Sequence, residues 1–264
     1  VARRAVELAE REQGVVVAAG GDGTINAVAQ AVLPTGRPLG VLPQGTFNYF
    51  GRTYGIPSDG VEATKALLRA KVRPVQLGLV NQRIFLVNAS VGLYPQLLEE
   101  RETYKRQFGR TRLVALCGGV LTILREHRKL VLQLEREGET RIMRAPTLFV
   151  GNNAMQLEQL GILEAEAVLS GKLVAIAVRP VTKLGMLGLL ARGALGQLGQ
   201  AENILTFAFE RLTVRLRRSY RRARVKIATD GEIGWSNLPL AFRVAPVPLH
   251  LLAPEPAEDS AKAV

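Results

Sequence analysis

A chain of 264 residues is long enough for one large domain or two modest ones, and its 47% hydrophobic content is ample for a packed core. No apolar run is long enough to span a bilayer. The single cysteine, Cys117, excludes an internal disulfide and a cysteine-based zinc site, and favours a cytoplasmic location. The formal net charge of +12 indicates an anionic partner, which leaves nucleotides, anionic membranes and nucleic acids open.

The first part of the chain alternates predicted strands with predicted helices. Buried apolar strands are expected at 15–19 and 38–42, and helices over 1–13, 25–33, a segment reaching Phe50, and 57–70. This alternation predicts an α/β domain with a parallel sheet over residues 1–73.

After about residue 72 the pattern becomes a succession of strands. These are expected at 75–80, 83–89, 130–135, 147–150, 172–178, 205–216 and 224–228, and they predict a mainly β second domain over 74–239. Residues 240–254 are again strand-like, and whether they complete the first domain stays open. The Pro/Ala/Glu-rich tail at 255–264 is expected to be disordered.

A glycine-rich loop follows the first predicted strand and opens a helix. It contains Gly20, Gly21, Asp22, Gly23, Thr24 and, in the first helical turns, Asn26. Glycines let the backbone approach a phosphate, and the free N–H groups of a helix start favour an anion. Asp22 is expected either to cap the helix or to lie beside a phosphate-bound magnesium ion. The loop has neither the P-loop nor the dinucleotide-binding pattern, and a tight turn without a ligand is the structural alternative.

A second loop at 43–48 repeats this arrangement after the second predicted strand. Gly45 gives the turn, and Thr46 and Asn48 offer short polar side chains. Parallel neighbouring strands would bring both loops to the same edge of the sheet, where open α/β sheets bind ligands. An ordinary turn is again the alternative.

Together these motifs resemble the diacylglycerol kinase catalytic-domain family, which includes bacterial lipid kinases and sphingosine kinases and is distantly related to NAD kinases. The resemblance rests on GGDGTIN, PLGVLPQGTFNYFGR, the Gly-Asn segment at 150–153 and Thr229-Asp230-Gly231-Glu232. It covers nearly everything from Gly14 to Pro254. The family usually carries an earlier strand and loop, so this chain is expected to lack its N-terminal strand.

The resemblance implies a Rossmann-like, NAD-kinase-like nucleotide domain followed by a β-sandwich-like domain, with the active site in a cleft between them. It implies ATP with Mg²⁺ as phosphoryl donor and a lipid hydroxyl as acceptor. The nucleotide would contact residues 20–26, Gly45, Thr46 and Asn48. Asp22, Asp230 and Glu232 would be catalytic, with Glu232 as the general base. A plain β-turn is the alternative for Asp230-Gly231.

One stretch departs from the family pattern. Many bacterial members bind a structural magnesium ion with several carboxylates, where this chain has Leu169-Ser170-Gly171-Lys172-Leu173-Val174. Mg²⁺ requires oxygen ligands, several of them charged. We therefore expect this structural site to be lost at Ser170.

Basic residues gather in two clusters, at 101–129 and at 215–226. They favour peripheral contact with an anionic membrane surface, whereas no recognised module supports nucleic-acid binding. The apolar, glycine-rich segment 183–200 is interpreted as a core helix or loop, with a membrane surface or lipid entrance as the alternative. A kinase of a soluble acceptor and a non-catalytic nucleotide- or lipid-binding protein also remain open, as does a homodimer.

Overall fold

The computed structural model describes residues 1–93, 95, 130–217 and 224–255. The chain divides into two compact units, a first unit of Val1–Leu77 with Ala245–Val264 and a second unit of Gly78–Val244. The expected boundary near Arg73 thus lies at Leu77. The basic cluster at 101–129 and the tail beyond residue 255 lie outside the described residues.

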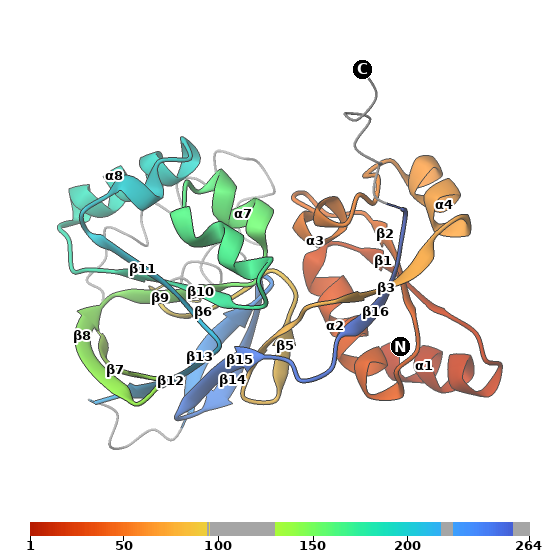
Figure 1. The fold of residues 1–264 in the computed structure, drawn as a ribbon, viewed down its shortest axis with the longest axis horizontal. Helices are drawn as coiled ribbons and strands as arrows, with labels where there is room; N and C mark the ends of the chain where they lie inside the picture. Colours follow the sequence, from red (N-terminus) through yellow and green to blue (C-terminus); the bar gives the residue numbers. More distant parts are fainter. Residues whose placement is uncertain (94, 96–129, 218–223, 256–264) are drawn as a thin grey trace, which may run out of the picture. The chain divides into compact units, whose positions relative to one another are not determined.

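The first unit is an α/β fold around one sheet, with the order β1-β2-β16-β3 (Figure 1). Its strands are β1 (Val16–Gly20), β2 (Leu39–Pro43), β3 (Lys71–Val75) and β16 (Leu249–Ala253). Its helical segments are α1 (Ala2–Arg11), α2 (Asp22–Val32), η1 (Leu33–Thr35), α3 (Tyr49–Thr53) and α4 (Gly60–Leu68). β1, β2 and β16 are parallel, but β3 runs antiparallel to β16. The predicted parallel sheet is therefore found for β1, β2 and β16, and β3 adds an antiparallel edge strand.

The segment at 240–254 is shared between the two units. β15 (Leu240–Val244) belongs to a sheet of the second unit, whereas β16 enters the sheet of the first unit between β2 and β3. β16 alternates buried Leu249, Leu251 and Ala253 with partly exposed residues, as a strand covered on one face does. The C-terminal strand is therefore an internal strand of the sheet that carries both glycine loops.

The second unit is mainly β and contains two sheets within the described residues. One has the order β11-β10-β9-β6-β13-β14 and the other β5-β4-β15-β12-β7-β8. The strands are β4 (Gly78–Val80), β5 (Arg83–Phe85), β6 (Asn88–Gly92), β7 (Leu130–Arg136), β8 (Glu139–Ala145), β9 (Thr147–Gly151), β10 (Leu173–Val178), β11 (Ile204–Phe209), β12 (Arg211–Leu216), β13 (Arg224–Thr229), β14 (Glu232–Asn237) and β15. The helical segments are α7 (Ala154–Gln159), η2 (Leu163–Val168), α8 (Lys183–Ala194) and η3 (Leu198–Gln200).

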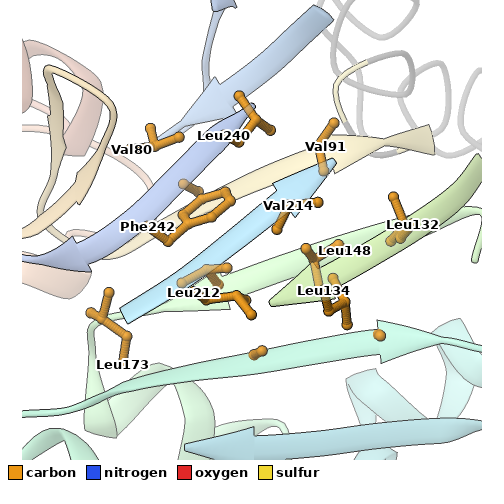
Figure 2. Close-up of a cluster of buried hydrophobic side chains, with 14 of the residues drawn as sticks. Val80, Val91, Leu132, Leu134, Leu148, Leu173, Leu212, Val214, Leu240 and Phe242 are labelled. Carbon is orange, nitrogen blue, oxygen red and sulfur yellow. The ribbon is translucent and has the colours of Figure 1, made fainter. Parts of the chain in front are cut away.

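Aliphatic side chains from both sheets form the core of the second unit (Figure 2). Leu212 and Val214 of β12 meet Leu132 and Leu134 of β7, and Phe242 of β15 packs in the same cluster. The alternation of apolar and charged residues in β12 explains this arrangement, because successive side chains of a strand point to opposite faces. The prediction of an α/β domain followed by a mainly β, sandwich-like domain is confirmed.

The segment at 205–216 departs from the expected single strand. β11 and β12 belong to different sheets, and the charged residue Glu210 lies between them. The segment at 183–200 forms α8 and η3. Throughout the described part of the chain, no helix is both long and apolar enough to cross a membrane.

Candidate functional site

The loop between β1 and α2 leaves the start of α2 open. Gly21 is the N-cap in an extended conformation, and no side chain caps the helix. Ile25 makes the first backbone hydrogen bond of the helix, to the Gly21 carbonyl at 3.0 Å. Within the described part of the chain, no acceptor meets the N–H groups of residues 22–24. The positive end of the helix dipole therefore faces outward with free donors, which suits an anion.

The loop between β2 and α3 is closed by its own asparagine. Asn48 adopts a left-handed conformation, with φ 50°, and is buried. Its Nδ2 donates to the Gly45 carbonyl at 2.9 Å, and the Gly45 N–H donates to its Oδ1 at 2.7 Å. Thr46 lies exposed at the tip of this loop. Asn48 therefore shapes the loop from inside, while Thr46 offers its hydroxyl to a ligand.

The two loops touch through their glycines. The Gln44 N–H donates to the Gly20 carbonyl at 2.8 Å, which extends the β1–β2 pairing into the loops. A Cβ on Gly45 would lie 2.6 Å from the Gly21 Cα, and a Cβ on Gly21 would lie 3.1 Å from the Gly45 Cα. Real Cβ atoms do not approach a backbone carbon as closely as 2.6 Å, so Gly45 must be a glycine in this arrangement.

Asp22 joins the second loop to the first. Its Oδ1 accepts the Phe50 N–H at 3.0 Å and its Oδ2 accepts the Tyr49 N–H at 3.2 Å, at the start of α3. Burial raises the pKa of Asp22 above its ordinary 3.8, and the two N–H donors act in the opposite direction. In the structure this carboxylate caps the neighbouring helix α3. It does not cap α2, the helix to which Asp22 itself belongs.

The raised pKa of Asp22 gives a first prediction. Because the folded chain binds this proton more tightly than the unfolded chain does, the contribution of Asp22 to stability is greatest below 3.8. It is lost as pH rises from there through the raised pKa. Asp22→Asn should flatten this part of the pH dependence. Urea unfolding followed by circular dichroism, at a series of acidic to neutral pH values, measures the difference. Identical pH slopes in the two proteins would contradict the assignment.

The second unit holds Asp230 in a two-residue turn between β13 and β14. Asp230 and Gly231 have φ of 48° and 84°, the left-handed pair that tight hairpins require. The buried Asp230 carboxylate accepts three backbone N–H groups, from Leu86 at 2.7 Å, Val87 at 2.8 Å and Asn88 at 2.9 Å. The Asp230 N–H donates back to the Asn88 carbonyl at 2.9 Å. The turn and the segment 86–88 are thus bound together.

Asparagines extend this network to α7. The Asn152 N–H donates to the Val87 carbonyl at 2.8 Å, and its Nδ2 donates to the Leu86 carbonyl at 3.0 Å. The Asn88 Nδ2 donates to the Gln156 side chain at 3.1 Å, and Asn153 caps α7 by accepting the Gln156 N–H. Sequence reasoning missed the roles of Asn88 and Gln156. The signal for Asn88 was an amide within a strand of otherwise apolar and small residues.

Glu232 opens β14 next to this turn and is exposed. Within the described part of the chain, nothing donates a hydrogen bond to its carboxylate. The following residue on the same face of β14 is Gly234, and a Cβ there would lie 1.9 Å from an Arg83 guanidinium nitrogen. Gly234 therefore makes room on β14 for the Arg83 guanidinium. Sequence reasoning missed Arg83, although a glycine inside a strand is a signal of close approach.

The stretch at Ser170 forms a turn between η2 and β10. Gly171 has φ of 80°, and the Ser170 N–H donates to the Ala167 carbonyl at 3.2 Å. Among the described residues, no group of three or more His, Cys, Asp or Glu side chains could hold a metal ion. Part of the second basic cluster is engaged within the unit, since Arg215 pairs with Glu135 at 2.8 Å and Lys226 lies over the Trp235 ring.

Comparison with known proteins gives matches over the first part of the chain. The sequence model of the diacylglycerol kinase catalytic domain matches residues 1–80. The diacylglycerol kinase of Bacillus subtilis (strain 168) is 42% identical over 96 residues, which cover 35% of this chain and 32% of that protein. An uncharacterised protein of Synechocystis is 31% identical over 140 residues, which cover 53% of this chain and 32% of that protein. The match thus spans about a third, 32%, of the length of these relatives.

Solved structures resemble the fold over nearly the whole chain. A crystal structure of a diacylglycerol kinase from Bacillus anthracis strain Sterne aligns with a TM-score of 0.65 and 16% identity, and covers 96% of this chain and 82% of that one. A second structure from the same organism aligns with a TM-score of 0.70 and 18% identity, over 97% and 84% of the two chains. At these identities the likeness shows the fold, an α/β unit with a mostly β second unit.

Proposed function

We propose that this chain is a diacylglycerol kinase-type enzyme, as the match of that family's model to residues 1–80 supports, and that it transfers the γ-phosphoryl group of ATP to the hydroxyl group of a diacylglycerol-like lipid. The observation that carries the proposal is the pair of touching glycine loops beside the open start of α2. Phosphoryl transfer depends mainly on positioning and on electrostatic stabilisation of the phosphates, and such a loop pair offers both.

In this proposal the first unit holds the nucleotide. The free N–H groups of residues 22–24 bind phosphate oxygens. The missing side chains of Gly20, Gly21 and Gly45 let Thr24 and the two loops pack closely beside them. The ligand is also contacted by the hydroxyl groups of Thr24 and Thr46 and by the side chain of Asn26. Asn48 shapes the second loop through its hydrogen bonds to Gly45. Mg²⁺ bound with ATP supplies the positive charge that offsets the phosphates. Asp22 acts mainly by fixing α3 against the loop, because main-chain donors occupy both of its oxygens.

The second unit supplies the general base. The exposed Glu232 carboxylate accepts the proton of the lipid hydroxyl as the hydroxyl oxygen bonds to the γ-phosphorus, and the bond from the γ-phosphorus to ADP breaks. Asp230 is a positioning residue in this scheme. Its three backbone hydrogen bonds hold the turn from which Glu232 projects. A neutral glutamine at 232 would keep the shape of the side chain and lose its capacity to take the proton.

Glu232→Gln is therefore expected to lower the turnover number about 100-fold or more. Folding should stay within about 0.5 kcal/mol of the parent, because the side chain is exposed. Glu139→Gln is the matched control, since Glu139 is also an exposed glutamate at the start of a strand in the second unit. The measurement is ATP consumption with a diacylglycerol substrate. Unchanged turnover in Glu232→Gln would remove this residue from the role of base.

The acceptor is tested on a panel of lipids with free hydroxyl groups, alongside NAD as a soluble acceptor. We expect phosphorylation of a diacylglycerol-like lipid and none of NAD. Activity with NAD alone would overturn the lipid proposal, and tight ATP binding without any transfer would favour a non-catalytic role.

The proposed substrate also sets where the protein works. ATP is a cytoplasmic metabolite and the lipid lies in a membrane, so we place the protein in the cytoplasm with peripheral contact to an anionic membrane surface. The formal net charge of +12 supports attraction to anionic headgroups.

A further inference from the structure

Helix α8 carries large apolar side chains on its outer surface. Leu184 is 80% exposed and Leu195, at the C-terminal cap, is 71% exposed. With Gly188 and Ala191 they form a stripe along one side of the helix, at spacings of four, three and four residues. Leu189 is the only residue of α8 that is buried. A single exposed leucine is ordinary, but a stripe on a helix that buries so little of itself indicates a surface used for contact.

The C-terminal end of α8 is fixed to the second unit by close backbone packing. The Leu198 N–H donates to the Leu160 carbonyl at 2.9 Å, and a Cβ on Gly161 would lie 2.0 Å from the Gly196 carbonyl oxygen. Leu163, two residues beyond Gly161, is itself 89% exposed. The stripe of α8 is thus held beside a second segment with an exposed leucine, and α7 and α8 lie on the same side of the sheet (Figure 1).

Both charged side chains of α8 itself are positive. Residues 179–201 contain Arg179, Lys183 and Arg192, all exposed, and no Asp or Glu. At 100° per residue, Lys183 and Arg192 stand on opposite sides of the stripe. Helices that lie in a membrane interface have this composition, with an apolar side for the acyl chains and cations for anionic headgroups. An acidic protein groove would also complement the cations, but such a partner would not produce the vesicle binding that is tested below.

We infer that α8 is the element that docks the protein on an anionic phospholipid bilayer. The leucines of the stripe insert at the headgroup boundary, and Lys183 and Arg192 contact anionic headgroups. This inference rests on the proposed function, because a kinase whose acceptor is a membrane lipid must reach that lipid at the bilayer surface.

The test is sedimentation of the full chain with phosphatidylcholine vesicles, with and without phosphatidylglycerol. The parent protein should bind the anionic vesicles. Leu184→Ser/Leu195→Ser should weaken that binding at least about tenfold, because each leucine loses an apolar contact with the membrane. Lys183→Ser/Arg192→Ser should remove the preference for phosphatidylglycerol. Leu68→Ser is the matched control, since Leu68 is 82% exposed at the end of α4 in the first unit, and it should bind as the parent does.

Two outcomes would overturn the inference: no vesicle binding by the parent, or equal binding by the parent and the double leucine variant. A kinase assay separates this inference from the proposed function. A short-chain diacylglycerol dissolved as monomers should be phosphorylated equally by the parent and the leucine variant, while vesicle-bound substrate should be phosphorylated more slowly by the variant. If neither substrate reacts and vesicle binding still depends on the leucines, the proposed function fails and the docking surface stands.

Discussion

Asp230→Ala is expected to destabilise the second unit by about 4 kcal/mol or more, because it leaves the N–H groups of Leu86, Val87 and Asn88 without their acceptor. Each of these donors is buried and bonded to a carboxylate, and each loses between about 1 and 3 kcal/mol when its partner is removed. The damage spreads because Asn152 binds the carbonyl groups of the same segment. Kinase activity should fall with stability, since the turn that carries Glu232 loses its anchor.

Urea unfolding measured by tryptophan fluorescence tests this directly. The chain has one tryptophan, Trp235, in β14, so its signal reports the second unit. Thr182→Ala is the control in the same unit. Thr182 caps α8 by accepting the Gly185 N–H but is exposed, and its loss should cost only about 1 kcal/mol. If Asp230→Ala unfolds at the same urea concentration as Thr182→Ala, the three hydrogen bonds do not hold the turn.

Gly45→Ala is expected to lower kinase activity about 100-fold or more, because displacing catalytic elements by about 1 Å costs that much. The new Cβ would lie 2.6 Å from the Gly21 Cα and 2.7 Å from the Asn48 Oδ1. Neither neighbour can give way easily, since one is backbone and the other holds the Gly45 N–H. The two loops must separate, and the overpacking should cost about 1–3 kcal/mol of stability.

Binding of a fluorescent ATP analogue separates the loss of the nucleotide site from a general loss of folding. Gly60→Ala is the matched control, because a Cβ on Gly60 meets nothing within 4 Å at the start of α4. It should bind the analogue as the parent does. Normal binding by Gly45→Ala would show that contact between the loops is not needed for the nucleotide.

Local sequence patterns were enough to predict the elements around the first glycine loop. An apolar run, a glycine turn and a helical period specify a strand, a loop and a helix within a dozen residues, and β1 and α2 follow that order. The division into an α/β and a mainly β part was predicted from motifs of this kind and is confirmed. The predicted resemblance agrees with the match of the family's sequence model to residues 1–80. The roles of the individual residues at the two loops remain predictions.

Contacts between residues far apart in the chain were not predicted, because the spacing of residues along the sequence does not specify which of them meet. The acceptor for Leu86, Val87 and Asn88 is Asp230, 142–144 residues further on. The exchange of sheets between β11 and β12 was missed for the same reason. β11 is the edge strand of one sheet and β12 an internal strand of the other, and the packing of the two sheets decides that the chain changes sheet near Glu210.

The position of β16 has a consequence for how the protein is made. The ribosome delivers β1, β2 and β3 first, but the strand that lies between β2 and β3 arrives only after the whole second unit has been synthesised. Until then β2 and β3 have no shared neighbour, and the sheet beneath the glycine loops has a gap. The second unit can form its two sheets before the sheet of the first unit is complete. Because β16 is synthesised last, the unit that carries the glycine loops is the last of the two units that can complete its sheet.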